Sequence, residues 1–127
     1  MAYSPVPRYQ LLGQLLGANM NTTADQAIAL KSADCVVDKI EVRNASVSLT
    51  LAAGGFYTAA SKGGTAIVAA GQLYSGLTSA TLVLLATIAA LVKISGGTLY
   101  FSLTTAQGGA ATADIFVWGF NHDSSQP

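Results

Sequence analysis

The residues best suited to acid–base chemistry lie close together in one stretch of the chain. Asp34, Asp38 and Glu41 fall within a single short segment, and a pair of carboxyl groups is what glycoside hydrolysis requires. Positively charged residues are interleaved with them: Lys31, Lys39 and Arg43. The carboxylates would then be neutralised by these neighbouring cations along the polar side of a strand, with no catalytic role, and we favour this second interpretation.

Histidine and cysteine each occur once, as His122 and Cys35. Zinc takes about four ligands, mostly of these two types. A nucleophilic triad would need His122 as its base, but His122 lies in a polar tail where nothing holds the nearby serines in register. Cys35 begins an apolar run, which predicts a buried thiol. We therefore expect no catalytic residue, no metal ligand, no cofactor and no enzymatic activity.

Two glycine pairs could be mistaken for phosphate-binding loops. Gly63-Gly64 lacks the spacing and the lysine of a P-loop, and Gly108-Gly109 precedes a strand pattern instead of a helix. Glycine is also the residue of turns that need a positive φ. Both pairs are predicted to be turns.

The composition limits which partners the protein can have. Of 127 residues, 51% are hydrophobic and 9% charged, and the formal net charge is zero. A neutral chain has no overall field to hold nucleic acid. The longest apolar run, residues 82–92, is shorter than the roughly 20 residues that span a membrane. We therefore expect neither nucleic acid nor a membrane as a partner. A surface so poor in charge does predict that other protein subunits cover part of it.

The chain start has no basic region followed by an apolar core, which argues against a secretory signal. The lone cysteine agrees with a reducing compartment. We therefore expect synthesis and retention in a cytoplasm.

The elements that position these residues have a period of two. Alternation of apolar and polar residues predicts a strand at 39–43, another at 46–51 and a long antiparallel hairpin from the runs at 99–104 and 115–118. Shorter strands are expected at 26–31, 56–58 and 65–69, one further strand at 82–92, and a single helical turn within 72–80. About eight short strands separated by glycine-rich turns predict an all-β fold, an antiparallel β-sandwich resembling a jelly roll.

The sequence divides into an N-terminal arm (1–24), a β-sandwich domain (25–121) and a polar C-terminal tail (122–127). Prolines at 5 and 7 predict an extended start. The apolar residues that follow nearly fit helical spacing, although Gly13 and Gly17 weaken a helix, so a short helix and an ordered arm both remain open. These side chains pack either on the domain's own core or on a neighbouring subunit.

Aromatic residues gather near the C-terminus. Alternation places Phe116, Trp118 and Phe120 on the face opposite Ile115 and Val117. A strand that is apolar on both faces is expected to be buried on both. One face lies in the core, and the other is covered by the edge of the second sheet, a stacked sugar or another subunit. The candidate partner interface comprises the following residues: Tyr9, Leu11, Leu12, Leu15, Leu16, Phe116, Trp118 and Phe120.

Several segments carry a resemblance to a known group of proteins. They are LGQ at 12–14, VRNAS at 42–46, AGGFYT at 53–58 and, most specific, LYFSLTTAQG at 99–108 followed by ADIFVWG at 113–119. In this order they resemble small virion proteins of tailed bacteriophages, of the capsid decoration (cement) type with a β-sandwich or jelly-roll fold. None of these segments is catalytic, so the likeness carries over no active-site residue.

The resemblance implies a structural protein that decorates and stabilises a bacteriophage capsid by binding the lattice of the major capsid protein. Its implied partners are the major capsid protein and copies of itself, as a homo-oligomer. It implies a location on the capsid surface of the virion after synthesis in the host bacterial cytoplasm. Similar small proteins also serve in phage tails and fibres, so a tail or fibre protein, or a carbohydrate (receptor) binding module, is the alternative.

Overall fold

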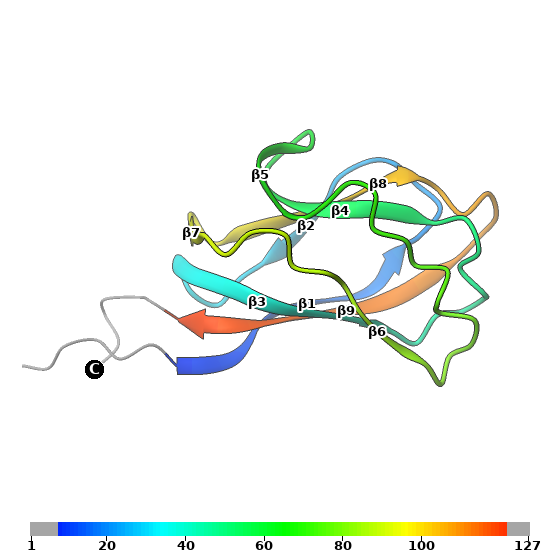
Figure 1. Cartoon of the computed structure of the whole chain (residues 1–127), viewed down its shortest axis with the longest axis horizontal. Coiled ribbons are helices and arrows are strands. Elements are labelled where there is room, and N and C mark those ends of the chain that lie inside the picture. Colours follow the sequence, from blue (N-terminus) through cyan, green and yellow to red (C-terminus); the bar gives the residue numbers. More distant parts are fainter. Residues whose placement is uncertain (1–7, 122–127) are drawn as a thin grey trace, which may run out of the picture.

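The computed structural model describes residues 8–121, which form nine strands and no helix. The strands build two sheets that face each other (Figure 1). Sheet A contains β1 (Arg8–Asn19), β9 (Thr112–Asn121), β3 (Asp34–Arg43) and β6 (Val83–Leu85) in that order, with β7 (Lys93–Ser95) also paired to β3. Sheet B has the order β2 (Gln26–Ala29), β8 (Thr98–Thr105), β4 (Ala53–Ala59) and β5 (Gly63–Val68). The all-β sandwich predicted from the sequence is confirmed.

The connectivity is that of a jelly roll. Strand β6 pairs with the C-terminal end of β3 and β7 pairs with its N-terminal end, both antiparallel, so the two share one strand position. With β6 and β7 counted together, successive strands pass between the sheets everywhere except at the β4–β5 hairpin. Strands β1 and β2 pair with β9 and β8. This arrangement of two four-strand layers is the jelly-roll pattern.

The core lies between the sheets and is built by alternation, which a register shift between Val37 and Lys39 interrupts in β3. Along β3 the inward positions are Cys35, Val37, Ile40 and Val42, all fully buried. The ring of Phe101 in β8 lies at the centre, with ring-centroid distances of 4.8 Å to Phe56 and 6.1 Å to Tyr74. A buried hydroxyl needs a partner, and the hydroxyl of Tyr74 donates to the Gly54 carbonyl at 2.9 Å.

Close strand approach requires glycine at two positions. A Cβ at Gly119 in β9 would collide with the backbone of Val36 in β3, and one at Gly55 in β4 would collide with the carbonyl of Val68 in β5. Any side chain there would push paired strands apart.

The segment expected to be an arm is, in its described part, an edge strand of sheet A. Strand β1 pairs antiparallel with β9 from Arg8 to Asn19, interrupted by two register shifts. These shifts bracket Leu12 and the Leu16-Gly17 pair, and an extra residue at a bulge changes which face the following side chains occupy. The apolar pairs spaced four apart therefore imitate a helix without forming one. The predicted extended start at residues 1–7 and the tail at 122–127 lie outside the described residues.

The predicted hairpin between 99–104 and 115–118 is wrong. Strands β8 and β9 exist, but β8 belongs to sheet B and β9 to sheet A. The connection at 106–111 crosses between the sheets and is held by backbone hydrogen bonds between Gln107 and Met20 and between Met20 and Ala111, both 2.9 Å. Alternation within a strand reports its faces and carries no information on which strand it pairs with.

Two further expectations differ from the structure. Residues 46–51 form no strand, because only Leu49 of the alternating apolar residues is buried. The side chain of Gln107 holds this loop instead, by accepting from the backbone N–H groups of Leu51 and Ala52. Residues 72–80 form turns with no helical turn.

The long apolar run at 82–92 is a strand only at β6. The chain then leaves sheet A, where the Ala86 N–H donates to the Ile40 carbonyl, and reaches sheet B, where the Ala89 N–H donates to the Ile67 carbonyl. The run thus closes one side of the sandwich. No helix capable of crossing a membrane occurs among residues 8–121.

Candidate functional site

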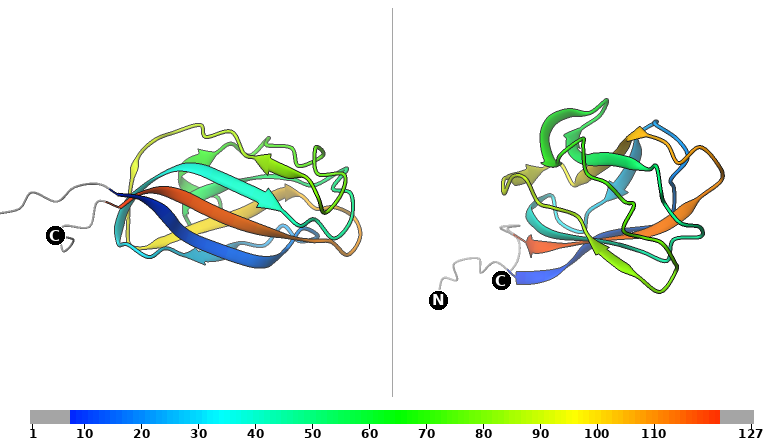
Figure 2. Two further views of the ribbon diagram at one scale, coloured as in Figure 1. Left: turned by 90° about the horizontal axis from the view of Figure 1, so that it is seen from below. Right: turned by 45° about the vertical axis from the view of Figure 1, so that its right-hand side comes forward.

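The strongest candidate site is the outer face of sheet A, where β1, β9 and β3 lie side by side (Figure 2, left). Along β9, Ile115 and Val117 are buried in the core, so the alternating residues point outward. The register sets Tyr9 of β1 opposite Phe120 of β9. We call the following residues the aromatic face: Tyr9, Phe116, Trp118 and Phe120.

In the aromatic face, the ring of Tyr9 contacts those of Trp118 and Phe120 across the strands. Tyr9 stacks on Trp118 with a centroid distance of 6.2 Å and an interplanar angle of 13°, and it meets Phe120 edge-on at 5.2 Å. Tyr9 is 46% exposed and Phe120 36%, whereas Trp118 and Phe116 are half-buried. Such pairs contribute about 0.5–1.5 kcal/mol beyond their buried area.

Two cations of β3 cover the remaining ring surfaces. The Nζ of Lys39 lies 5.1 Å from the centroid of the Trp118 ring, and the guanidinium carbon of Arg43 lies 4.3 Å from that of Phe116. Lys39 is the direct cross-strand neighbour of Trp118. Each cation–π contact stabilises by about 0.5–1 kcal/mol at an exposed site. The charged residues of β3 therefore keep an aromatic surface compatible with water.

Three polar atoms of this region are buried without a hydrogen-bond partner among the described residues. They are Asp38 Oδ1, Arg43 Nε and Trp118 Nε1, and such an atom costs about 1–3 kcal/mol. Burial, followed by the charge and hydrogen bond of Asp38 and the charge of Glu41, raises the pKa of Tyr9. Asp38 and Glu41 of β3 are therefore close enough to the aromatic face to raise the pKa of the Tyr9 hydroxyl.

The four leucines of the sequence-predicted interface lie in different environments. Leu11 is the cross-strand neighbour of Trp118 and lies beside the aromatic face. Leu12 is fully buried in the protein's own core, which is one of the two alternatives left open by the sequence. The half-buried Leu15 packs against that core. Leu16 is 59% exposed within the second bulge of β1.

The other residues that the sequence analysis considered for catalysis, metal binding or phosphate binding have structural roles wherever the structure describes them. Cys35 is buried, as expected, and burial raises its pKa to about 11, with a smaller contribution from the charge of Asp34. Among residues 8–121, no group of three His, Cys, Asp or Glu side chains is placed to hold a metal. Gly108 has a φ of 90° and lies in the connection between β8 and β9, as the turn interpretation predicts. Gly63 and Gly64 are instead the first residues of β5, directly after the turn, and Gly64 has a φ of 67°. His122 lies outside the described residues.

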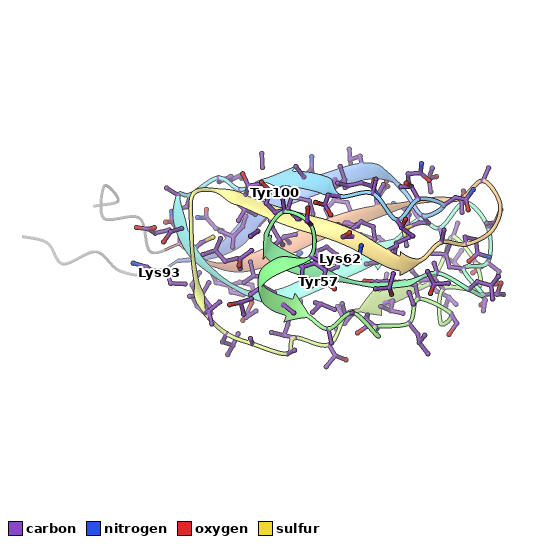
Figure 3. All side chains as sticks on the ribbon, turned by 90° about the horizontal axis from the view of Figure 1, so that it is seen from above. Tyr57, Lys62, Lys93 and Tyr100 are labelled. Carbon is purple, nitrogen blue, oxygen red and sulfur yellow. The ribbon has the colours of Figure 1, made fainter. Side chains whose placement is uncertain are left out.

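One polar cluster was missed from the sequence because its members lie far apart along the chain. Figure 3 views the outer side of sheet B, where Lys62 lies with Tyr57 and Tyr100. The Nζ of Lys62 donates to Ser102 Oγ at 2.8 Å, and the Ser61 N–H donates to the Asp25 carboxylate at 2.6 Å. The second bond is the main reason why the pKa of Asp25 is lowered. These bonds fasten the β4–β5 hairpin onto the sheet.

A second feature missed from the sequence is the exposure of large aliphatic side chains within residues 72–92. Its signal in the sequence is plain, since no residue from 63 to 92 is charged. Alternation alone does not show whether such a run is buried or exposed.

Comparison of the chain with protein-family models, with curated proteins and with solved structures finds no match.

Proposed function

We propose that this chain is a structural protein of a bacteriophage particle that decorates and stabilises the capsid by binding the lattice of the major capsid protein. The likeness of residues 99–108 and 113–119 to small phage virion proteins supports this proposal. The jelly-roll fold agrees with it, because viral capsid domains are one of the groups built on that fold. The protein would be made in the host bacterial cytoplasm and act on the capsid surface.

The observation that carries the proposal is the aromatic face. Binding hot spots are enriched in Trp, Tyr and Arg. Tyr9 stacks on Trp118, and Arg43 lies over Phe116, on the outer face of sheet A. Phe120 and Tyr9 remain exposed enough to enter a pocket of a partner. A capsid lattice presents many identical copies of such a partner, and a homo-oligomer of this chain that contacts several copies at once would gain affinity from their linkage.

The test is binding to empty shells assembled from the major capsid protein encoded in the same genome. Cosedimentation of the purified chain with these shells is measured for the parent, for Phe120→Lys and for Leu51→Lys. Leu51 is 59% exposed in the loop that precedes β4, so its substitution controls for a general effect of added charge. We expect Phe120→Lys to weaken binding by about tenfold or more, equivalent to about 1.4 kcal/mol, and Leu51→Lys to leave it unchanged. Absence of binding by the parent contradicts the proposal.

The stack of Tyr9 on Trp118 favours a second candidate, a carbohydrate (receptor) binding module in a phage tail or fibre. Partly exposed aromatic rings are the surfaces on which sugars stack. Trp118 is the only tryptophan, so titration with host surface saccharides would quench its fluorescence if a sugar binds there. Saturable quenching together with absent shell binding would establish this alternative in place of capsid decoration.

A further inference from the structure

The outer face of sheet A continues past the aromatic face onto the edge strand β6. Strand β3 lies between β9 and β6, and its pairing with β6 sets Leu85 beside Glu41. The same register sets Val83 beside Arg43. Leu84 packs against the core, so its two neighbours in β6 point outward, as alternation requires. Figure 2 (left) shows the four strands side by side on this face.

The β6 end of this face has two exposed aliphatic side chains. Val83 is 52% exposed and Leu85 is 58% exposed, and we call them the aliphatic pair. Single exposed aliphatic residues are common on protein surfaces, so exposure alone assigns no role to them. Their position relative to the aromatic face is what gives them one.

The aliphatic pair lies within reach of the aromatic rings. Phe116 lies opposite Glu41, and Glu41 lies opposite Leu85. Neighbouring strands are about 4.8 Å apart, so Leu85 is roughly 10 Å from Phe116, across one intervening strand. The guanidinium of Arg43, the cross-strand neighbour of Val83, lies 4.3 Å from the Phe116 ring centroid. Aromatic and aliphatic side chains therefore belong to one continuous surface.

The area that a protein partner needs decides how far its contact extends. Tyr9 and Phe120 are 46% and 36% exposed. An aromatic residue has about 150–250 Å² of surface to bury, so these two offer only about 100–200 Å². A standard interface buries about 800 Å² on each partner, which corresponds to a circular patch with a radius of roughly 16 Å. A patch centred on the aromatic face therefore reaches β6.

We infer that the partner that binds the aromatic face also binds the aliphatic pair, so that the outer face of sheet A is one interface from β1 to β6. The inference rests on the proposed function and commits to the same partner, the capsid shell. The shell then presents two apolar contact points, one for Tyr9 and Phe120 and one for Val83 and Leu85. They are about 20 Å apart, because three strand spacings and about four residues along a strand separate them.

The residues between the two apolar ends indicate the class of partner. Charges of both signs lie there, Lys39, Glu41 and Arg43 of β3, with Asp114 of β9 opposite Arg43. Such a surface has no field of one sign to hold a polyanion. A saccharide ring stacked on the aromatic face would leave β6 free, whereas a folded protein surface covers both ends. Contact at the aliphatic pair therefore distinguishes a protein partner from a sugar.

The experiment adds three variants to the cosedimentation with shells: Leu85→Lys, Leu85→Thr and Leu73→Lys. Leu73 is 61% exposed and bridges to Ala53 of sheet B, so it is a matched control that lies outside sheet A. We expect Leu85→Lys to raise the dissociation constant about tenfold, because the lysine charge enters an apolar contact. Leu85→Thr keeps β propensity and should raise it about threefold. Leu73→Lys should bind like the parent.

Hydroxyl-radical footprinting of the shell-bound parent gives a second measurement that needs no variant. Labelling of Val83 and Leu85 should fall several-fold on binding, and labelling of Leu73 should not change. If Phe120→Lys weakens binding while Leu85→Lys does not, and Leu85 is still labelled in the complex, this inference is wrong and the proposed function stands. An equal effect of Leu73→Lys and Leu85→Lys would also overturn it. A parent that does not bind shells refutes the proposed function, and the inference with it.

Discussion

Replacing Trp118 by alanine tests whether the aromatic face stabilises the fold as an outer surface or as part of the core. The half-buried Trp118 side chain contacts Tyr9 and Lys39 on the outside of sheet A. Its loss removes a stacked pair worth about 0.5–1.5 kcal/mol and a cation–π contact of about 0.5–1 kcal/mol. Solvent fills the space left behind, so no cavity remains. We expect a loss of about 2 kcal/mol in the free energy of unfolding.

Phe101→Ala is the comparison, since Phe101 is fully buried between Phe56 and Tyr74. A large-to-small change there leaves a cavity and should cost about 3–5 kcal/mol. Urea denaturation followed by far-UV circular dichroism measures both variants, with the m-value checking that the unfolded states are comparable. A Trp118→Ala loss equal to that of Phe101→Ala would refute the outer-surface assignment.

A double-mutant cycle isolates the stacked pair itself. The coupling energy between Tyr9→Ala and Trp118→Ala should be about 0.5–1.5 kcal/mol. The cycle of Trp118→Ala with Phe101→Ala should be additive within about 0.5 kcal/mol, because the two residues lie on opposite sides of the sheet A backbone. A coupling near zero for Tyr9 and Trp118 would mean that the stack adds nothing to stability.

Three further predictions concern the stability of the fold. Deleting residues 1–19 should abolish cooperative unfolding, because it removes β1 and the buried Leu12. Ser61→Gly should stabilise the protein by about 0.5–1 kcal/mol, since Ser61 is exposed with a φ of 59° in the β4–β5 turn. Above pH 9 the unfolded Cys35 thiol ionises while the folded one stays protonated to about pH 11, so stability should fall across this range by up to about 1.4 kcal/mol per pH unit.

Each of these three predictions has a contradicting result. A truncated chain that still melts cooperatively would show that β1 is dispensable. An unchanged or lower midpoint for Ser61→Gly in urea would show that the turn is unstrained. The Cys35→Ala variant should lose the corresponding part of the alkaline slope, and an identical slope in parent and variant would assign the effect to other groups.

The sequence predicted the faces of the long strands well, because burial imposes alternation locally. In β3 the expected apolar face, which includes Ile40 and Val42, is the buried one, and in β9 the expected aromatic residues point outward. Pairing between strands was predicted poorly. The hairpin expected from β8 and β9 does not exist, since two strands in opposite sheets show the same alternation as two strands of one hairpin.

The candidate site was predicted in part for the same reason. Trp118 and Tyr9 were both named from the sequence, but their contact depends on the register of β1 against β9, which two bulges set. Ordinary alternation separates Leu11, which faces outward, from Leu12 in the core. The faces of the residues after each bulge cannot be obtained from a period of two, because a bulge shifts the alternation by one residue.

The two cations of β3 determine how the aromatic face can meet a partner. On the aromatic face, Lys39 and Arg43 lie over the rings of Trp118 and Phe116. Long side chains can move aside when a partner arrives and return when it leaves, so this surface suits a reversible contact.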